Sequence, residues 1–208
     1  MHSIEKAVQV AAVCLALVLA VPGAARAEEA ASSTAGAAMA SHIGIFNFGK
    51  VSPTYYRGGE LEGRDAADLA ALGVKTVIDL RGSDYDPEEA PLVAAAGMSY
   101  VRMPMTTHTA PTPEQIATFL SIVNDPAKQP VYVHCVEGRH RTGVMTAVYR
   151  MTVDHWTADQ AFEEMKHYKF GFDFLHAEFK QFVYAYHPAA PAGAPVQIAS
   201  AATASATN

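Results

Sequence analysis

The sequence predicts an α/β fold in which a central, mostly parallel sheet is flanked by helices on both faces. Short runs rich in β-branched and aromatic residues alternate with runs of helical periodicity, and Gly73 and Gly97 each follow a helical run at the position where a left-handed residue ends a helix. With 208 residues, half of them hydrophobic, the chain is long enough for one domain with a sizeable core. Ligands of such sheets bind beyond the carboxyl ends of the strands, so the residues that follow each strand are the first candidates for a site.

The first 27 residues are typical of an export signal. Lys6 provides a positive start, Ala7 to Val21 form an apolar run, and Ala25-Arg26-Ala27 is a small-x-small cleavage site. The apolar run of about fifteen residues is shorter than the roughly twenty that a membrane-spanning helix needs. We therefore expect cleavage after Ala27, no stable membrane insertion afterwards, and a periplasmic or secreted protein.

Composition also sets the limits of the predicted domain. Residues 28–41 and 188–208 consist mainly of small residues and proline, which bury too little surface to fold, and are predicted to be a disordered linker and tail. The predicted domain is therefore 42–187. A net charge of -6 with no basic stripe argues against a nucleic-acid partner, and we expect a monomer.

The elements of this domain are predicted from periodicity and helix caps. Thr112 with Gln115, and Thr157 with Gln160, have the spacing of a capping box at a helix start. Strands are predicted at 43–48, 54–57, 74–80, 98–103 and 131–134, and helices at 64–72, 87–96, 113–124, 141–154, from 157 onwards, and at 172–186.

Cys135 follows the last predicted strand and precedes a predicted helix. Because cleavage of the signal removes Cys14, the mature chain keeps one cysteine and cannot form an internal disulfide. A cysteine that attacks a phosphate ester must be a thiolate, and the phosphate oxygens must be held beside it. The residues from Val136 to Arg141 form a short loop between strand and helix, where backbone N–H groups and the helix N-terminus can bind an anion.

Several side chains of this loop fit phosphate chemistry. Arg141, six positions after the cysteine, has a planar fork that can hold two phosphate oxygens, which lysine cannot do. The Thr142 hydroxyl can donate to the sulfur and help the thiolate leave a phosphocysteine intermediate. Gly138 permits a close turn and Gly143 a close helix start. His134 is expected to orient the loop through hydrogen bonds. The loop therefore predicts a phosphate-binding nucleophile site.

The segment His134-Cys135-Val136-Glu137-Gly138-Arg139-His140-Arg141-Thr142-Gly143 resembles the signature loop of the protein tyrosine phosphatase superfamily. Together with Asn47-Phe48, Tyr56-Arg57-Gly58-Gly59 and Val77-Ile78-Asp79-Leu80-Arg81, it is similar to the atypical dual-specificity phosphatases first known from plants and fungi. The resemblance implies the dual-specificity phosphatase fold, neither metal nor cofactor, and a two-step reaction through phosphocysteine. It also implies phosphoprotein or inositol phosphate substrates, bound by Val136, Glu137, Gly138, Arg139, His140 and Arg141.

The substrate class stays open at this stage. Members of that group that act on inositol pyrophosphates have basic residues directly after the cysteine, whereas this chain has Val136 and Glu137. Glu137 repels very anionic ligands, and Arg139 and His140 keep part of the positive character. The alternatives are a phosphotyrosine or dual-specificity phosphoprotein phosphatase, an inositol phosphate or pyrophosphate phosphatase, and a phosphate-binding module with weak catalysis. A rhodanese-like sulfurtransferase fits the Arg-Thr-Gly closure less well.

The general acid is not evident from the sequence. The loop before the signature, 104–113, contains no carboxylate, so the candidates are His108 within it, Glu114 just after it and Asp173 in a later loop. Each also has a structural interpretation, as a surface residue, a helix-dipole partner or a helix cap. Arg57 and Arg81 follow or end strands and are candidate substrate-binding residues or structural ion pairs. The nine histidines show no metal-binding spacing.

Overall fold

The computed structural model describes residues 43–188, which lie within one compact unit. A five-stranded sheet has the order β1-β2-β5-β3-β4, with β1 antiparallel to β2 and the other neighbours parallel. The strands are β1 (Gly49–Ser52), β2 (Tyr55–Gly58), β3 (Thr76–Asp79), β4 (Ser99–Arg102) and β5 (Val131–His134). The helices are α2 (Asp65–Ala71), α3 (Glu89–Ala95), α4 (Pro113–Val123), α5 (Arg141–Thr152), α6 (Ala158–His167), the 3₁₀ turn η1 (Asp173–His176) and α7 (Ala177–Ala185).

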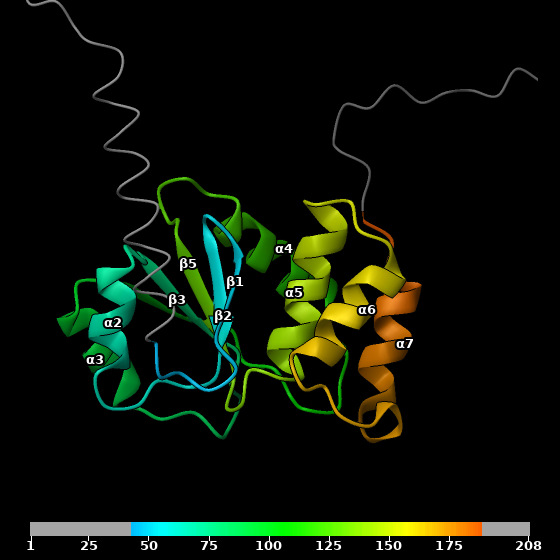
Figure 1. The fold of residues 1–208 in the computed structure, drawn as a ribbon, viewed down its shortest axis with the longest axis horizontal. Coiled ribbons are helices and arrows are strands. Elements are labelled where there is room, and N and C mark those ends of the chain that lie inside the picture. Colours follow the sequence, from blue (N-terminus) through cyan, green and yellow to red (C-terminus); the bar gives the residue numbers. More distant parts are fainter. Residues whose placement is uncertain (1–42, 189–208) are drawn as a thin grey trace, which may run out of the picture. The chain divides into compact units, whose positions relative to one another are not determined.

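Helices cover both faces of the sheet, as the sequence predicts. Helices α2 and α3 lie on one face, and α4 to α7 lie on the other (Figure 1). Each face has its own apolar cluster. The smaller centres on Leu69, Val77 and Tyr132, and the larger on Val133, Met145 and Phe179, all of them buried. Helix α5, which follows the loop after Cys135, is buried along most of its length and is therefore part of the core.

Two predicted elements differ from the observed ones. The strand predicted at 43–48 is wrong, because the chain turns at Asn47, whose φ is 57°, and pairing begins only at Gly49. The helix predicted at 172–186 is interrupted: η1 leads into α7 through His176, whose backbone is not helical. Both capping boxes are confirmed, as are the left-handed glycines Gly73 and Gly97.

Some predictions fall on other parts of the chain. The predicted signal (1–27), the linker (28–41) and all but the first residue of the tail (188–208) lie outside the described residues. Within 43–188, no helix combines the length and the apolar character that crossing a membrane requires.

The carboxyl ends of three parallel strands meet at one edge of the sheet. Gly58 of β2 and Asp79 of β3 both pair with His134, the last residue of β5. Cys135 therefore emerges from the centre of the sheet, between two strand ends, at the edge where ligands of α/β sheets bind.

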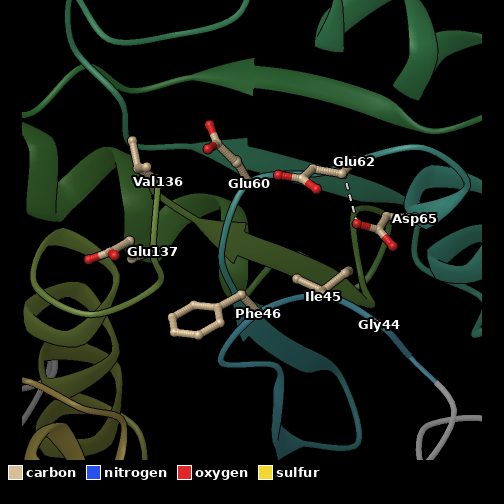
Figure 2. Close-up of a pocket in the computed structure, with 8 residues that line it drawn as sticks. All are labelled: Gly44, Ile45, Phe46, Glu60, Glu62, Asp65, Val136 and Glu137. Atoms are coloured by element: carbon tan, nitrogen blue, oxygen red, sulfur yellow. Dashed lines mark hydrogen bonds between the residues drawn. The ribbon is translucent and has the colours of Figure 1, made fainter.

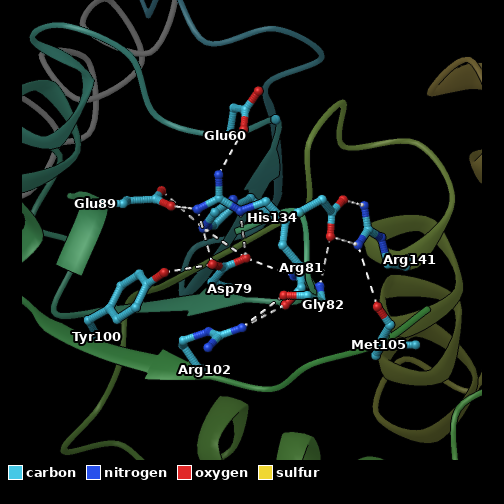
Figure 3. A network of polar contacts seen from close by, with 12 residues as sticks. Glu60, Asp79, Arg81, Gly82, Glu89, Tyr100, Arg102, Met105, His134 and Arg141 are labelled. Carbon is cyan, nitrogen blue, oxygen red and sulfur yellow. Dashed lines mark hydrogen bonds and ion pairs between the residues drawn. The ribbon is translucent and has the colours of Figure 1, made fainter. Parts of the chain in front are cut away.

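A buried ion-pair network lies at this edge (Figure 3). Arg81 is almost completely buried and donates to both carboxylate oxygens of Asp79, at 3.0 Å each, and to Glu60 at 2.7 Å. It also forms an ion pair with Glu89 of α3, whose other oxygen lies 3.2 Å from Nε2 of His134. The network thus ties β3, α3 and the residue before Cys135 together.

We predict that Asp79→Asn lowers the free energy of unfolding by about 3–5 kcal/mol, because removing one partner of a buried ion pair leaves Arg81 without full charge compensation. Urea unfolding followed by circular dichroism measures this loss. Asp68→Asn is the matched control: it removes the partner of Arg64, whose side chain is 84% exposed, and should change stability far less. Equal effects of the two substitutions would contradict a stabilising role for the network.

Candidate active site

Cys135 lies at the base of a cavity formed by the loop between β5 and α5. The cysteine is buried, with 3% of its surface exposed, and the cavity has a volume of about 240 Å³. Helix α5 begins at Arg141, so the positive end of its dipole faces the loop that carries the thiol. The cavity is lined by Asp84, Thr107, Cys135, Val136, Glu137, Arg139, His140 and Arg141. Five of the six predicted phosphate-binding residues therefore line it together with the predicted nucleophile; Gly138 is the sixth.

Arg141 reaches this cavity and meets a carboxylate there. Its Nη1 and Nη2 donate to the two oxygens of Asp84, at 3.0 and 2.7 Å. Its Nε is buried and has no hydrogen-bond partner among the described residues. Hydrogen bonds from Arg141 hold the pKa of Asp84 below its usual range. The guanidinium is thus fixed in the cavity, with one strong donor still unused.

The loop is supported from behind by Arg57 and Asn47. Arg57 is fully buried, donates through Nη2 to the carbonyl of Gly138, and stacks 4.0 Å from the ring centre of Tyr168. The Asn47 amide donates to the carbonyls of Glu137 (3.3 Å), Gly138 (3.0 Å) and Tyr168 (2.8 Å). The two side chains therefore fix the backbone of the loop.

His134 and Thr142 flank the cysteine from inside the core. Burial lowers the pKa of His134 to about 4, so its imidazole is neutral near pH 7. Neither ring nitrogen has a hydrogen-bond partner among the described residues, so the hydrogen bonds expected to orient the loop are not formed in this structure. The Thr142 hydroxyl is fully buried and has no hydrogen-bond partner among the described residues, so the predicted bond to the Cys135 sulfur is not formed in this structure. It remains a buried donor without a partner, one residue along from Arg141.

Two of the three candidate acids do not line the cavity and are engaged elsewhere. Glu114 lies in the first turn of α4, where hydrogen bonds from its own backbone N–H and from Thr112 lower its pKa. Asp173 accepts from Lys166 at 2.5 Å and from Lys180 at 2.7 Å, and these hydrogen bonds lower its pKa. Both carboxyl groups are therefore held ionised by structural contacts, and neither is placed to protonate a leaving group.

The third candidate, His108, is 70% exposed and does not line the cavity either. Its ring stacks on His176 at a centroid distance of 5.1 Å, and His176 in turn lies 3.6 Å from the ring of His140. Nδ1 of His108 lies 3.5 Å from Glu178. His108 therefore belongs to a column of imidazoles beside the loop.

Two clusters within residues 43–188 bring potential metal-ligating atoms within 4.8 Å of one another: His108 with His176 and Glu178, and Asp79 with Glu89 and His134. In the first cluster the two histidine rings are nearly parallel, at 14°, so their in-plane lone pairs do not converge on one ion. In the second, Arg81 already supplies the positive charge between the carboxylates. We assign no metal to either cluster.

Arg81 and Arg57 are each at most 1% exposed and do not line the cavity, so neither is placed to touch a substrate there. Arg81 is held by the ion-pair network, which is the structural alternative expected for it. Arg57 donates through Nη2 to the loop backbone, while its Nε and Nη1 have no hydrogen-bond partner among the described residues. Burial also lowers the pKa of Arg57.

Two further residues of the site lie outside the signature. Asn47 belongs to a segment that carries the family resemblance, but the sequence gives it no role, and no pattern in the sequence marks Asp84.

The geometry agrees with comparisons to known proteins. Residues 47–182 match the family model described as "DSP-PTPase phosphatase fused to NAD+ Kinase". The chain belongs to this family. The relatives include a rice protein named "Probable NAD kinase 2, chloroplastic", 34% identical over 48% of this chain but only 11% of its own length. The dual specificity protein phosphatase TpbA of Pseudomonas aeruginosa is 32% identical over 70% of this chain and 64% of its own.

Solved structures of this phosphatase family share the fold. The core catalytic domain of the PP-IP phosphatase SIW14 from S. cerevisiae, crystallised with citrate, has a TM-score of 0.60 and 26% identity, over 69% of this chain and 86% of its own. A cysteine-to-serine variant of P. aeruginosa TpbA in complex with pTyr has a TM-score of 0.57 and 27% identity, over 66% of this chain and 83% of its own.

We predict that Gly138→Ala abolishes or strongly reduces phosphate binding in this phosphatase. Gly138 has φ of 62°, and an added Cβ would overlap the backbone of Gly58, so the loop would have to move. Gly63→Ala is the matched control, since Gly63 also has a positive φ, of 52°, but nothing lies within 4 Å of an added Cβ. Titration with vanadate or phosphate, followed by intrinsic fluorescence, measures the affinity. If both variants bind vanadate or phosphate as tightly as the wild type does, the close approach of the loop to Gly58 is not needed for anion binding.

Proposed function

We propose that the protein hydrolyses phosphate monoesters through a phosphocysteine intermediate on Cys135. The observation that carries this proposal is a pair of buried donors without partners at the start of α5: Nε of Arg141, which lines the cavity together with Cys135, and the Thr142 hydroxyl. A buried donor that stays unpaired costs about 1–3 kcal/mol, so such groups gather where a ligand satisfies them. An anion at the base of this cavity would accept from Arg141 and lie against the positive end of α5.

In the proposed first step, the Cys135 sulfur attacks phosphorus and the bond to the ester oxygen breaks. Arg141 holds equatorial oxygens of the phosphoryl group as charge spreads over them, which stabilises the transition state more than the ground state. In the second step water attacks phosphorus, the bond to sulfur breaks, and phosphate leaves. Donation from Thr142 to the departing sulfur stabilises the thiolate that is regenerated.

The surroundings of the cavity favour a singly phosphorylated protein side chain over a polyphosphorylated ring. A second cavity of about 400 Å³ adjoins the first through Val136 and Glu137. Figure 2 shows its carboxylates, with Glu60, Glu62 and Asp65 near one another and Glu137 beyond Val136. This acidic wall repels the extra phosphates of an inositol polyphosphate and attracts basic side chains next to a phosphorylated residue.

The relatives allow both substrate classes. TpbA is named a dual specificity protein phosphatase and was crystallised with pTyr, whereas SIW14 is named a PP-IP phosphatase. We place phosphotyrosine or dual-specificity phosphoprotein substrates first because of the acidic second cavity, and inositol phosphates second because Arg139 and His140 lie at the first.

The purified protein should hydrolyse p-nitrophenyl phosphate and a phosphotyrosine peptide, and Cys135→Ser should lose all turnover because an alcohol is a far weaker nucleophile than a thiolate. Arg141→Lys should lose most of kcat/KM, since an ammonium cannot bind two oxygens with a planar fork. Phosphate release measures both. Arg64→Lys is the control. Arg64 is exposed and does not line the cavity, so this substitution should leave phosphate release unchanged. Absence of wild-type turnover on every phosphate ester would refute the proposal.

The same assay decides the substrate class when it includes phosphoserine peptides and inositol phosphates. Glu137→Gln should raise kcat/KM for inositol phosphates relative to the phosphotyrosine peptide, because it removes one charge from the wall shared by the two cavities. A wild-type preference for inositol phosphates would replace the first candidate substrate class with the second.

We also propose that the protein is exported and acts in the periplasm or outside the cell. The support is the sequence alone: the positive start at Lys6, the apolar run that follows, and the cleavage site at Ala25-Arg26-Ala27. Mass spectrometry of the protein expressed from its full-length gene should give a mature chain that begins at Glu28. An uncleaved chain in the cytoplasm would contradict export. The monomeric state stays a prediction.

A further inference from the structure

A reaction through phosphocysteine needs a proton for the leaving oxygen, and none of the three sequence candidates lines the cavity. Two carboxylates do line it, Asp84 and Glu137. Glu137 lies 3.3 Å from Arg139 and is more exposed, at 54%, on the side of the acidic second cavity. Asp84, by contrast, is held on Arg141, the side chain that would bind the phosphate.

We propose that Asp84 is the general acid of the first step and the general base of the second. This inference rests on the proposed function and adds a catalytic residue to it. Asp84 lies in the loop between β3 and α3, whereas the acid was expected in or near the loop before the signature, 104–113. That loop has no carboxylate, and Asp84 supplies the acid from another segment of the chain.

The loop that carries Asp84 is anchored at both ends by buried residues, and its middle is exposed to solvent. Arg81, just before it, and Glu89, just after it, are buried and form an ion pair with each other (Figure 3). Arg102 donates to the carbonyl of Gly82 at 3.0 Å and stacks 3.6 Å from the ring centre of Tyr85. Between these anchors the Asp84 side chain is 42% exposed. Asp84 Oδ1 also accepts from the backbone N–H of Gly82 at 2.9 Å, within the same loop. For proton transfer the carboxylate must leave Arg141 and turn towards the mouth of the cavity, which its exposure permits while the anchors stay in place.

Substrate binding would prepare Asp84 for proton transfer. In the free protein, hydrogen bonds from Arg141 lower the pKa of Asp84. A phosphate dianion competes for the same donors, which weakens those hydrogen bonds, and it brings negative charge next to the carboxylate. Both changes raise the pKa of Asp84 in the complex, so its protonated form is favoured only when a substrate is bound.

The proton balance closes over the two steps. The Cys135 sulfur attacks phosphorus, the ester P–O bond breaks with its electron pair on oxygen, and protonated Asp84 gives that oxygen its proton. Water then attacks the phosphocysteine, ionised Asp84 takes a proton from it, and the P–S bond breaks to restore the thiolate. Inorganic phosphate and the alcohol leave, and Asp84 is again protonated.

The test compares a poor leaving group with a good one in Asp84→Asn, a substitution that preserves size. With phenyl phosphate, kcat should fall by about 10²–10⁴-fold, the usual contribution of general acid-base catalysis. With p-nitrophenyl phosphate the fall should be smaller, because nitrophenolate leaves without full protonation. The basic limb of the kcat pH profile should disappear, since kcat reports the groups of the enzyme–substrate complex, in which Asp84 must be protonated.

Asp86→Asn is the matched control. Asp86 lies in the same loop, accepts from the backbone N–H of Glu88 at 2.9 Å, and does not line the cavity, so both substrates and the pH profile should be unchanged. Thermal unfolding of both variants reports whether they fold. A burst of nitrophenol from Asp84→Asn would show that Cys135 still becomes phosphorylated, which separates loss of the acid from failure of the proposed function.

Two outcomes would overturn the inference. If Asp84→Asn lowers KM equally for both substrates and keeps the basic limb, Asp84 only competes with phosphate for Arg141. If neither kcat nor the pH profile changes, Asp84 has no part in the reaction.

Discussion

The buried ion pairs of Arg81 are the interaction on which the rest of the site depends. Asp79 ends β3, Glu89 begins α3, and His134 ends β5, so one guanidinium and its partners join three elements at the edge of the sheet where Cys135 emerges. Two charges removed from water need nearly complete pairing to be tolerated. The pairing therefore fixes the strand ends, and with them the start of the loop that carries the thiol.

The loop itself depends on a second set of contacts made by its backbone. Arg57 and Asn47 both donate to the carbonyl of Gly138, from two segments distant in sequence. These hydrogen bonds occupy the carbonyls of the loop. Other atoms of the loop line the cavity. Arg57 and Arg81 thus resemble each other: both are buried arginines at this edge of the sheet, and neither lines the cavity.

Charge at the cavity is balanced. Arg139 and Arg141 face the carboxylates of Glu137 and Asp84, so the free site does not present a strong positive field. A phosphate must compete with Asp84 for Arg141, and a molecule with many phosphates also meets the acidic second cavity. On the proposed function, this balance would favour ligands with one phosphate and would make the protonation of Asp84 depend on binding.

Local sequence patterns predicted most of the fold because caps and periodicity act over a few residues. The capping boxes at Thr112 and Thr157 form as expected, and so does the strand, loop and helix order around Cys135. The strand predicted at 43–48 failed for a local reason as well, since apolar alternation there does not reveal the left-handed turn at Asn47. The acid candidates failed for a different reason: Glu114 and Asp173 were chosen by proximity in sequence, and their actual partners are a helix cap and two lysines.

The sequence by itself therefore determined the family, the nucleophile loop and its arginine, because these residues lie within ten consecutive positions whose chemistry is local. Only the tertiary structure decided which residues surround them. Asp84 and Arg141 are 57 positions apart, and Asn47 and Gly138 are 91 apart. The first pair meets because the parallel strands β3 and β5 end at one edge of the sheet, and the second because β1, antiparallel to β2, begins at that edge. No local pattern records such a meeting, since it depends on strand order and on the packing of both layers.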